Sequence, residues 1–361
     1  MSELNISTVN IMMGDTCNFS CRYCLQKENI CAQERKTIDD SVIDYIKHLV
    51  NIRPKTANKI MVYFWGGEPL LYPDIIKYVV DKLKDSVYYT IVTNGAKLNQ
   101  DFVDFLNKNR ISLILSHDGP QTAKTRGINV LEDSNFIQLF NQIIDRGVDV
   151  CVSAYNQDYY SAWNYLEEKL GSNITIFHDP LVVTWNMPED LYAFDFDAYR
   201  KTMQTIIEKA YEGVLNQTFT REYFLLSKPL DKILKILNSK KNKNHLYCPT
   251  MRSAISIDLD GNVNFCHNKT KKLGNVTDSF DILLDNFDKA YKQQKEKMSS
   301  CEQCEYASLC GYGCLNSSDS LKGREACCTM NKILIDACLQ FIKKFELSLE
   351  SVDLSDDYVC N

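Results

Sequence analysis

Three cysteines near the start of the chain have a spacing that could hold an iron–sulfur cluster. Cys17, Cys21 and Cys24 form a C-x3-C-x2-C pattern directly after a predicted strand at residues 9–13. Three closely spaced thiolates can bind three irons of a [4Fe–4S] cube and leave the fourth iron open. Chance thiols and a zinc site are the alternatives, but structural zinc sites use four ligands, commonly as two C-x2-C pairs, which this loop lacks. The spacing favours an open cluster.

A second set of cysteines lies in the C-terminal third of the chain. Two well-separated members precede a C-x2-C-x5-C-x3-C run and an adjacent pair, and the set comprises Cys248, Cys266, Cys301, Cys304, Cys310, Cys314, Cys327 and Cys328. Fifteen cysteines in a chain without a secretion signal indicate metal binding rather than disulfides. A zinc-stapled module is the alternative. The remaining cysteines receive no role, and they are Cys31, Cys151, Cys338 and Cys360.

Composition limits the classes of partner. Apolar residues make up 45% and charged residues 24% of the chain, as in ordinary globular proteins. The net charge is −6 and the only basic stretch lies at residues 240–243, which argues against nucleic acid or an anionic membrane as the partner. There is no signal peptide and no apolar stretch of roughly 20 residues. We therefore expect a cytoplasmic protein.

The first part of the chain alternates β-rich and amphipathic segments. Strands are predicted at 9–13, 60–65, 87–93, 111–116, 148–153 and 174–178, and helices between them at 41–50, 75–84, 101–107, 136–146 and 159–170. Six β/α units with right-handed crossovers predict an α/β fold, a partial (β/α)6 TIM-like barrel. Catalytic loops of such barrels lie at the C-terminal ends of the strands.

Four segments follow from this pattern. We predict the barrel at 1–215, a helical connector at 216–247, a cysteine-rich domain at 248–340 and an acidic tail at 341–361. Further helices are expected at 196–213 and 223–238.

Polar and glycine-rich loops follow three successive predicted strands. The second strand is followed by Gly66, Gly67, Glu68 and Pro69, the third by Thr93 and Asn94, and the fourth by the segment from Ser116 to Pro120, which contains Asp118. Glycines allow close approach of a ligand to the backbone, and a carboxylate suits an ammonium group. A single turn of this kind would indicate only a loop. Three of them in order, at the same edge of the sheet, favour a binding site.

The cysteine loop, with the aromatic Tyr23 before its third cysteine, resembles the signature of the radical S-adenosylmethionine (SAM) superfamily. The resemblance implies that the open iron binds the amino nitrogen and carboxylate of SAM. Its one-electron cleavage then gives methionine and a 5′-deoxyadenosyl radical, which abstracts a substrate hydrogen. It also implies that residues near the three strand ends line the cofactor, with Ser116 and Arg126 near its carboxylate or ribose. The cofactor-binding residues implied in this way are Tyr23, Gly66, Gly67, Glu68, Pro69, Thr93, Asn94, Ser116, Asp118 and Arg126.

The order of the later cysteines resembles the SPASM domain, which implies two auxiliary [4Fe–4S] clusters and three clusters in total. The first auxiliary cluster would take Cys248, Cys266 and Cys314, and its last iron would bind water, a non-cysteine side chain or a substrate thiolate. Cys360, the spare member of the Cys327–Cys328 pair and His267 are the competing ligands of that iron. The second would take Cys301, Cys304, Cys310 and Cys328. Cys328 is preferred over Cys327 because it leads directly into a predicted helix at 329–341.

The resemblance implies a peptide-modifying enzyme that forms a thioether or another crosslink, or epimerises a residue. Sulfatase maturation by formylglycine formation and radical oxidation of a small molecule are the alternatives. Relatives that mature sulfatases carry an aspartate where this chain has His267 and an extra cysteine that residues 249–264 lack, which argues against that activity. A cluster-bearing protein without catalysis fits poorly with an intact cofactor loop. The sequence identifies no catalytic acid, base or hydrogen donor.

The expected partners are a peptide or protein substrate and a reductant such as flavodoxin or ferredoxin. Few residues precede the first predicted strand. Recognition of a leader peptide would therefore use the surfaces of the barrel and the SPASM domain, or a separate leader-binding protein.

Overall fold

The computed structural model describes residues 6–26, 37–54, 56–183, 186–238, 248, 250–267, 271–314, 316 and 320–345. Cys31, Cys360, the basic stretch at 240–243 and the tail from residue 346 lie outside the described residues. The chain divides into two compact units, one of residues 1–151, 160–179 and 249–294, and the other of residues 152–159, 180–248 and 295–361. This division differs from the predicted linear order of segments, because residues 249–294 group with the N-terminal strands.

The first unit contains a parallel sheet whose strands follow one another along the chain. These strands are β1 (Thr8–Met12), β2 (Ile60–Trp65), β3 (Val87–Thr93), β4 (Ser112–Ser116), β5 (Arg146–Val152) and β6 (Thr175–Pro180). Each lies beside its sequence neighbour, and the pairs from β1 to β5 are parallel. All six predicted strands are present, within two residues of their expected ends. The predicted α/β fold is confirmed.

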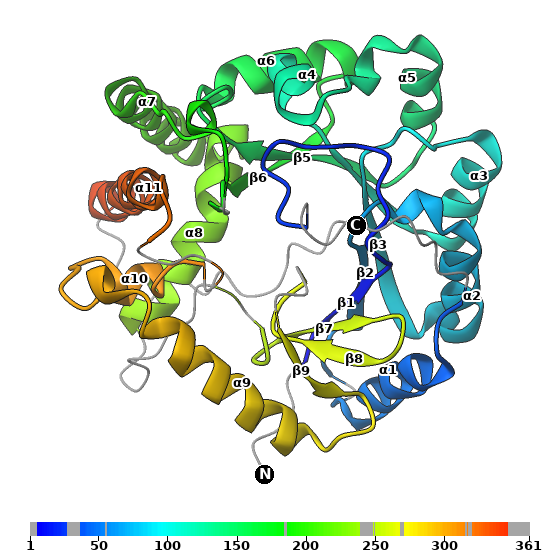
Figure 1. The fold of residues 1–361 in the computed structure, drawn as a ribbon. Helices are drawn as coiled ribbons and strands as arrows, with labels where there is room; N and C mark the ends of the chain where they lie inside the picture. Colours follow the sequence, from blue (N-terminus) through cyan, green and yellow to red (C-terminus); the bar gives the residue numbers. More distant parts are fainter. Residues whose placement is uncertain are drawn as a thin grey trace. The chain divides into compact units, whose positions relative to one another are not determined.

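Helices cover the outer side of these strands (Figure 1). They are α1 (Asp40–Ile52), α2 (Pro73–Leu83), α3 (Gln100–Asn109), α4 (Thr122–Arg126), α5 (Ser134–Asn141) and α6 (Tyr159–Leu170), and the short 3-10 turns between them are η1 (Pro69–Leu71), η2 (Lys84–Ser86), η3 (Gly119–Gln121) and η4 (Val130–Glu132). The side chains of Asp39, Asn99 and Asp133 accept hydrogen bonds from the first turns of α1, α3 and α5. Such caps satisfy backbone donors that have no partner within the helix.

The strands separate an apolar outer face from a more polar inner face. In β2, Val62 and Phe64 are fully buried, whereas the alternating Tyr63 and Trp65 are half-buried. Successive side chains of a strand point to opposite faces. The outer face therefore packs in the core under the helices, and the inner face carries polar and aromatic groups at which chemistry can take place.

Three strands from the C-terminal third extend this sheet. They are β7 (Ala254–Asp258), β8 (Asn262–Asn264) and β9 (Lys272–Asn275), and α9 (Phe280–Lys295) follows them. β7 pairs in parallel with β1, and β8 and β9 follow as antiparallel strands of a nine-stranded sheet. Ile255 and Ile257 are fully buried, and Gly261 adopts a φ of +78° in the β7–β8 turn. The pairing of β7 with β1 was not predicted from the sequence.

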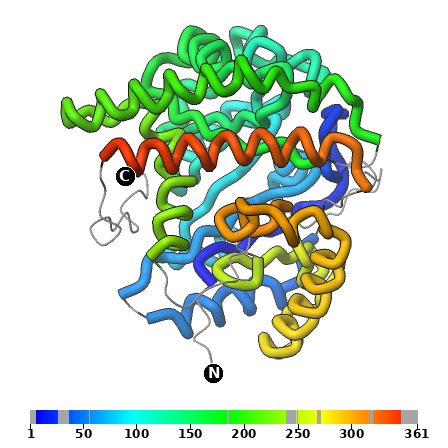
Figure 2. Tube along the Cα trace, turned by 90° about the vertical axis from the view of Figure 1, so that its left-hand side faces the viewer, coloured from blue at the N-terminus to red at the C-terminus, as the bar shows by residue number. Residues whose placement is uncertain are grey.

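The second unit is built mainly from three helices, α7 (Phe196–Leu215), α8 (Arg221–Asn238) and α11 (Arg324–Lys344), with η5 (Glu189–Leu191), η6 (Ser299–Cys301) and α10 (Ala307–Cys310). α7 and α11 run side by side (Figure 2). Their C-terminal ends meet through the rings of Tyr211 and Phe345, whose centroids lie 4.6 Å apart. No helix in the described part of the chain is long and apolar enough to span a membrane.

Candidate iron–sulfur and cofactor sites

The three N-terminal cysteines lie together on the loop after β1. Electrostatic interactions join Cys17 to Cys24, and Cys21 to both of them. The Cys17 sulfur accepts hydrogen bonds from the backbone N–H of Phe19, at 3.4 Å, and from the side-chain amide of Asn94, at 3.9 Å. Burial raises the pKa of the Cys17 thiol, and it raises the pKa of Cys21 to about 12. Such thiols become thiolates when a metal takes the place of the proton.

Glycines at the end of β2 let this loop lie directly against the strand. Gly67 has a φ of +38°, and a Cβ atom there would stand 2.2 Å from the carbonyl oxygen of Thr16. The same oxygen accepts a 2.9 Å hydrogen bond from the Glu68 N–H, and the Gln26 side chain accepts one of 2.7 Å from the Gly67 N–H. Gly67 is therefore required for the close approach. Gln26 was not predicted, because nothing in the sequence distinguishes it from any polar residue after the cluster motif.

The Glu68 carboxylate joins the ends of β2 and β3. It is 1% exposed and accepts hydrogen bonds from the Leu70 N–H, the Thr93 hydroxyl and the Asn94 N–H, the first and last at 2.9 and 2.8 Å. Burial raises its pKa, and these donors act in the opposite direction. A carboxylate offers about four acceptor positions. Three are used within the protein, so one remains with which an ammonium group could pair.

Asp118, at the end of β4, is the centre of a fully buried hydrogen-bond network. Its carboxylate accepts bonds of 2.6 Å from the hydroxyls of Tyr23 and Thr125, and one of 3.1 Å from the Cys151 N–H. The guanidinium of Arg126 donates one hydrogen bond of 3.2 Å to the same carboxylate, and its Nε lies 3.1 Å from the other carboxylate oxygen as an ion pair. The guanidinium lies 5.3 Å from the centre of the Tyr23 ring. We call the group Tyr23, Asp118, Thr125 and Arg126 the loop brace, because it fastens the cluster loop to β4 and α4.

Three members of the loop brace, Tyr23, Asp118 and Arg126, are also predicted cofactor-binding residues. The charged groups of Asp118 and Arg126 are engaged with each other, so their contact with a cofactor stays a prediction. Ser116 stands on the inner face of β4, half-buried, and its hydroxyl makes no hydrogen bond to any residue that the structure describes. Asn94 reaches the cluster loop through a 2.8 Å bond to Asn18. Polar groups from three strand ends therefore gather beside the cysteines.

His267 belongs to the same region of the first unit. Its ring meets Trp65 edge-on, with centroids 4.9 Å apart, and its carbonyl accepts a 3.2 Å bond from Gln26. Burial lowers the pKa of His267, and Asp179 at the end of β6 acts against this shift. Gln26 thus connects His267 to Gly67 and the cluster loop.

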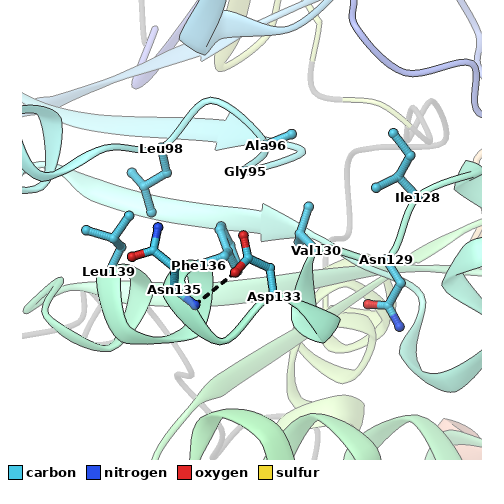
Figure 3. A pocket seen from close by; sticks show the side chains of 10 residues that line it. All are labelled: Gly95, Ala96, Leu98, Ile128, Asn129, Val130, Asp133, Asn135, Phe136 and Leu139. Atoms are coloured by element: carbon cyan, nitrogen blue, oxygen red, sulfur yellow. Dashed lines mark hydrogen bonds between the residues drawn. The ribbon is translucent and has the colours of Figure 1, made fainter.

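A pocket of about 240 Å³ opens beside the turn after β3 (Figure 3). Its lining residues are Gly95, Ala96, Leu98, Ile128, Asn129, Val130, Asp133, Asn135, Phe136 and Leu139. Asp133 is its only acidic group, and it caps α5 through the Asn135 N–H at 2.9 Å. The pocket therefore offers no constellation for catalysis, and the chemistry is to be sought at the cysteine loop.

The second unit brings four predicted ligands together. Cys310 interacts electrostatically with Cys301 and Cys328, and Cys328 with Cys301 and Cys304. Burial raises the pKa of Cys327 to about 12, and its electrostatic partners are Cys328 and Arg324. Of the other predicted ligands, Cys248 and Cys314 belong to the second unit and Cys266 to the first.

The donor chemistry of both groups suits iron–sulfur clusters. Among the described residues, no three His, Cys, Asp or Glu side chains converge on a point where a single metal ion would bind. Clusters are held differently, by Cys thiolates attached to separate irons. Sets of thiols with backbone and amide donors around them, as at Cys17 and Cys310, fit such a group.

Comparison with known families agrees with this geometry. Residues 11–156 match the model of the radical SAM superfamily, and residues 248–305 match SPASM, described as an iron–sulfur cluster-binding domain. The chain carries a radical SAM domain and a SPASM domain. The radical SAM match spans the cysteine loop and the ends of β2, β3 and β4, and the SPASM match includes Cys248, Cys266, Cys301 and Cys304.

Two relatives align over most of this chain. The radical SAM cyclopropyl synthase TigE of Paramaledivibacter caminithermalis is 23% identical, over 91% of this chain and 73% of TigE. The cysteine-type anaerobic sulfatase-maturating enzyme of Clostridium novyi is 20% identical, over 85% of this chain and 87% of that enzyme.

Solved structures share the radical SAM/SPASM fold. Native anSMEcpe with bound AdoMet and Cp18Cys peptide superposes with a TM-score of 0.68 at 19% identity, over 94% of this chain and 98% of that one. Streptococcus suis SuiB bound to precursor peptide SuiA gives 0.58 at 15% identity, over 86% and 72%.

Proposed function

We propose that this radical SAM/SPASM protein modifies a ribosomally made peptide, forming a crosslink or epimerising a residue. One observation carries the proposal: three cysteines, the glycines at the strand ends and the buried carboxylates of Glu68 and Asp118 lie together at the loop after β1, in a chain that also carries a SPASM domain. The structures of SuiB bound to precursor peptide SuiA and of anSMEcpe bound to Cp18Cys peptide, both similar over most of this chain, support a peptide as substrate.

In this proposal Cys17, Cys21 and Cys24 hold the cluster that binds SAM. When bound, the cofactor and a reduced cluster supply a 5′-deoxyadenosyl radical that removes one hydrogen atom from the substrate. Asn94 and the Phe19 N–H stabilise the Cys17 thiolate by donating to its sulfur. The loop brace keeps the loop fixed on β4, so that binding needs little reorganisation.

The strand ends would hold the methionine part of SAM. The remaining acceptor position of Glu68 pairs with the ammonium group, and the backbone at Gly66, Gly67 and Pro69 lies close enough to a ligand to contribute polar contacts. The Ser116 hydroxyl, which bonds to no described residue, faces the inner side of the sheet, where it can donate to a carboxylate or ribose oxygen. Thr93 acts by holding Glu68 in place.

Two auxiliary clusters complete the proposed inventory of three. The second takes Cys301, Cys304, Cys310 and Cys328, and the electrostatic neighbours of Cys328 support it over Cys327. The ligands of the first remain those expected from the sequence.

Sulfatase maturation is the second candidate, since an enzyme of that activity aligns over 85% of this chain. Against it stands His267, which occupies the position expected for an aspartate and packs on Trp65.

Anaerobic incubation with SAM and dithionite tests the proposal. Reconstituted protein should release 5′-deoxyadenosine, and a candidate peptide should lose two hydrogen atoms per crosslink, or exchange an α-hydrogen with solvent if it is epimerised. The Cys17→Ala, Cys21→Ala, Cys24→Ala triple variant should release none while keeping its auxiliary iron. Conversion of a sulfatase peptide to formylglycine, with no change in candidate peptides, would replace the proposal by the second candidate.

A further inference from the structure

Hydrogen-bond donors surround the cysteines predicted to hold the second auxiliary cluster. The Arg324 guanidinium donates to the Cys301 sulfur at 3.3 Å, and the Asn331 side-chain amide donates to the Cys310 sulfur at 3.0 Å. The Gly313 N–H is a further donor to Cys310. Two of the four sulfurs therefore receive donors from the protein even before a cluster is considered.

One helix presents the two side-chain donors. Arg324, Cys328 and Asn331 stand at positions i, i+4 and i+7 of α11, and residues with this spacing lie on one face of a helix. The start of α11 is fixed by Gly323, whose φ is +81° and where a Cβ atom would stand 2.6 Å from the ring of Tyr192. The position of Arg324, 6% exposed, is thus set by the packing of the helix.

The backbone donor belongs to an unusual loop. Gly311, Tyr312 and Gly313 have consecutive φ values of +76°, +68° and +72°. A residue other than glycine, such as Tyr312, rarely adopts this backbone conformation. Here the Lys295 ammonium lies over the Tyr312 ring, 4.0 Å from its centre. Successive N–H groups in such loops form concave anion-binding sites that are found at many iron–sulfur centres.

A cation also lies beside Cys310. The ammonium of Lys232, on α8, donates to the Cys310 carbonyl oxygen at 3.1 Å and is largely buried. Lys232 also interacts electrostatically with Cys248. Positively charged groups from both α8 and α11 therefore contact these cysteines.

We propose that Arg324, Asn331 and the Gly313 N–H raise the reduction potential of the cluster held by Cys301, Cys304, Cys310 and Cys328. The reduced cluster carries one more negative charge than the oxidised cluster, so donors and cations near its sulfurs stabilise the reduced form more. Arg324 has the largest effect, because its hydrogen bond is charge-assisted and buried. The inference rests on the ligand set of the proposed function.

A redox titration monitored by electron paramagnetic resonance, on the reconstituted full chain, tests it. Arg324→Gln should lower the potential of one cluster by 59 mV or more, which corresponds to a tenfold change in a one-electron equilibrium, and leave the other potentials in place. Asn331→Leu should lower the same potential by a smaller amount. Lys322→Gln is the matched control, because it removes one positive charge from an 84% exposed side chain two residues from Arg324, and it should change nothing.

The outcomes separate the inference from the ligand assignment. If the Cys301→Ala, Cys304→Ala variant retains all the iron of the wild type, the ligand set is wrong. If that variant loses one cluster but Arg324→Gln and Asn331→Leu keep the wild-type potentials, the ligand set stands and the inference is refuted. If Arg324→Gln fails to retain iron, the shift in Asn331→Leu decides the matter.

Discussion

Replacing Tyr23 by Phe removes one bond of the loop brace and leaves the packing of the ring intact. The lost contact is the 2.6 Å hydrogen bond to the Asp118 carboxylate, between side chains that are 9% and 0% exposed. Burial raises the pKa of Tyr23 well above its ordinary value, so its hydroxyl remains a donor at neutral pH. Hydrogen bonds to charged groups contribute about 1.5–3 kcal/mol. We expect the free energy of unfolding to fall by that amount.

The effect on function follows from the position of Tyr23 between Arg22 and Cys24. The Arg22 N–H is bound to the Thr125 carbonyl at 2.9 Å, so the loop has a second attachment and should keep its iron. If the correct conformation of the cluster loop loses about 1.4 kcal/mol relative to other conformations, its population changes tenfold. Release of 5′-deoxyadenosine should therefore slow by about tenfold or more, at unchanged iron content.

Anaerobic urea unfolding and a 5′-deoxyadenosine assay on the same samples measure both quantities. Tyr78→Phe is the matched control, because its hydroxyl donates to Asp40 at an exposed site, and such bonds contribute little in water. Asp118→Asn should destabilise the chain by about 3–5 kcal/mol, since it leaves the buried Arg126 without its counter-ion. A Tyr23→Phe protein as stable and as active as Tyr78→Phe would refute the brace.

Three further perturbations test other parts of the site. Glu68→Gln should lower the free energy of unfolding by about 1–3 kcal/mol and weaken SAM binding, because the amide replaces one acceptor oxygen by an NH2 group. Unchanged urea unfolding and an unchanged SAM titration would contradict this. Burial lowers the pKa of His117 to about 4, below the 6.5 of the unfolded chain, so unfolding takes up a proton between these two pH values. The free energy of unfolding should therefore fall as the pH is lowered, by about 2 kcal/mol from pH 7 to pH 5, and this loss should be absent in His117→Gln. Cys328→Ser should lose one auxiliary cluster by iron analysis, whereas Cys327→Ser should keep all clusters, and the reverse result would exchange the two assignments.

The strands and most helices could be predicted because their signals are local. Alternating burial in β2 and the cap at Asn99 are encoded within a few residues of each element. The helix expected at 136–146 ends instead at Asn141, because Asn107 of α3 hydrogen-bonds the Gln142 carbonyl and the Ile144 N–H and holds a turn there. Such a contact between distant segments leaves no periodic pattern in the sequence.

The same reasoning explains what was missed at the site. Cysteine spacing and strand-end glycines identified the loop, but the Asp118 carboxylate looked like one of several polar groups in a turn. Its partners Tyr23, Thr125, Arg126 and Cys151 come from three separate segments of the chain, and only their meeting in space shows that it positions the loop. Likewise, the parallel pairing of β7 with β1 joins residues that are 246 apart in the sequence, such as Thr8 and Ala254, and a run such as Ala254–Asp258 carries no mark of its partner.

Transfer of deuterium from a labelled peptide to 5′-deoxyadenosine tests the central claim most directly. The reconstituted full chain would be incubated anaerobically with SAM, dithionite and a candidate peptide deuterated at the carbon to be modified, and the nucleoside analysed by mass spectrometry. The account predicts one deuterium in 5′-deoxyadenosine for each modified peptide, and none from the Cys17→Ala, Cys21→Ala, Cys24→Ala variant. Modified peptide without deuterium in the nucleoside, or equal transfer by the triple variant, would contradict it.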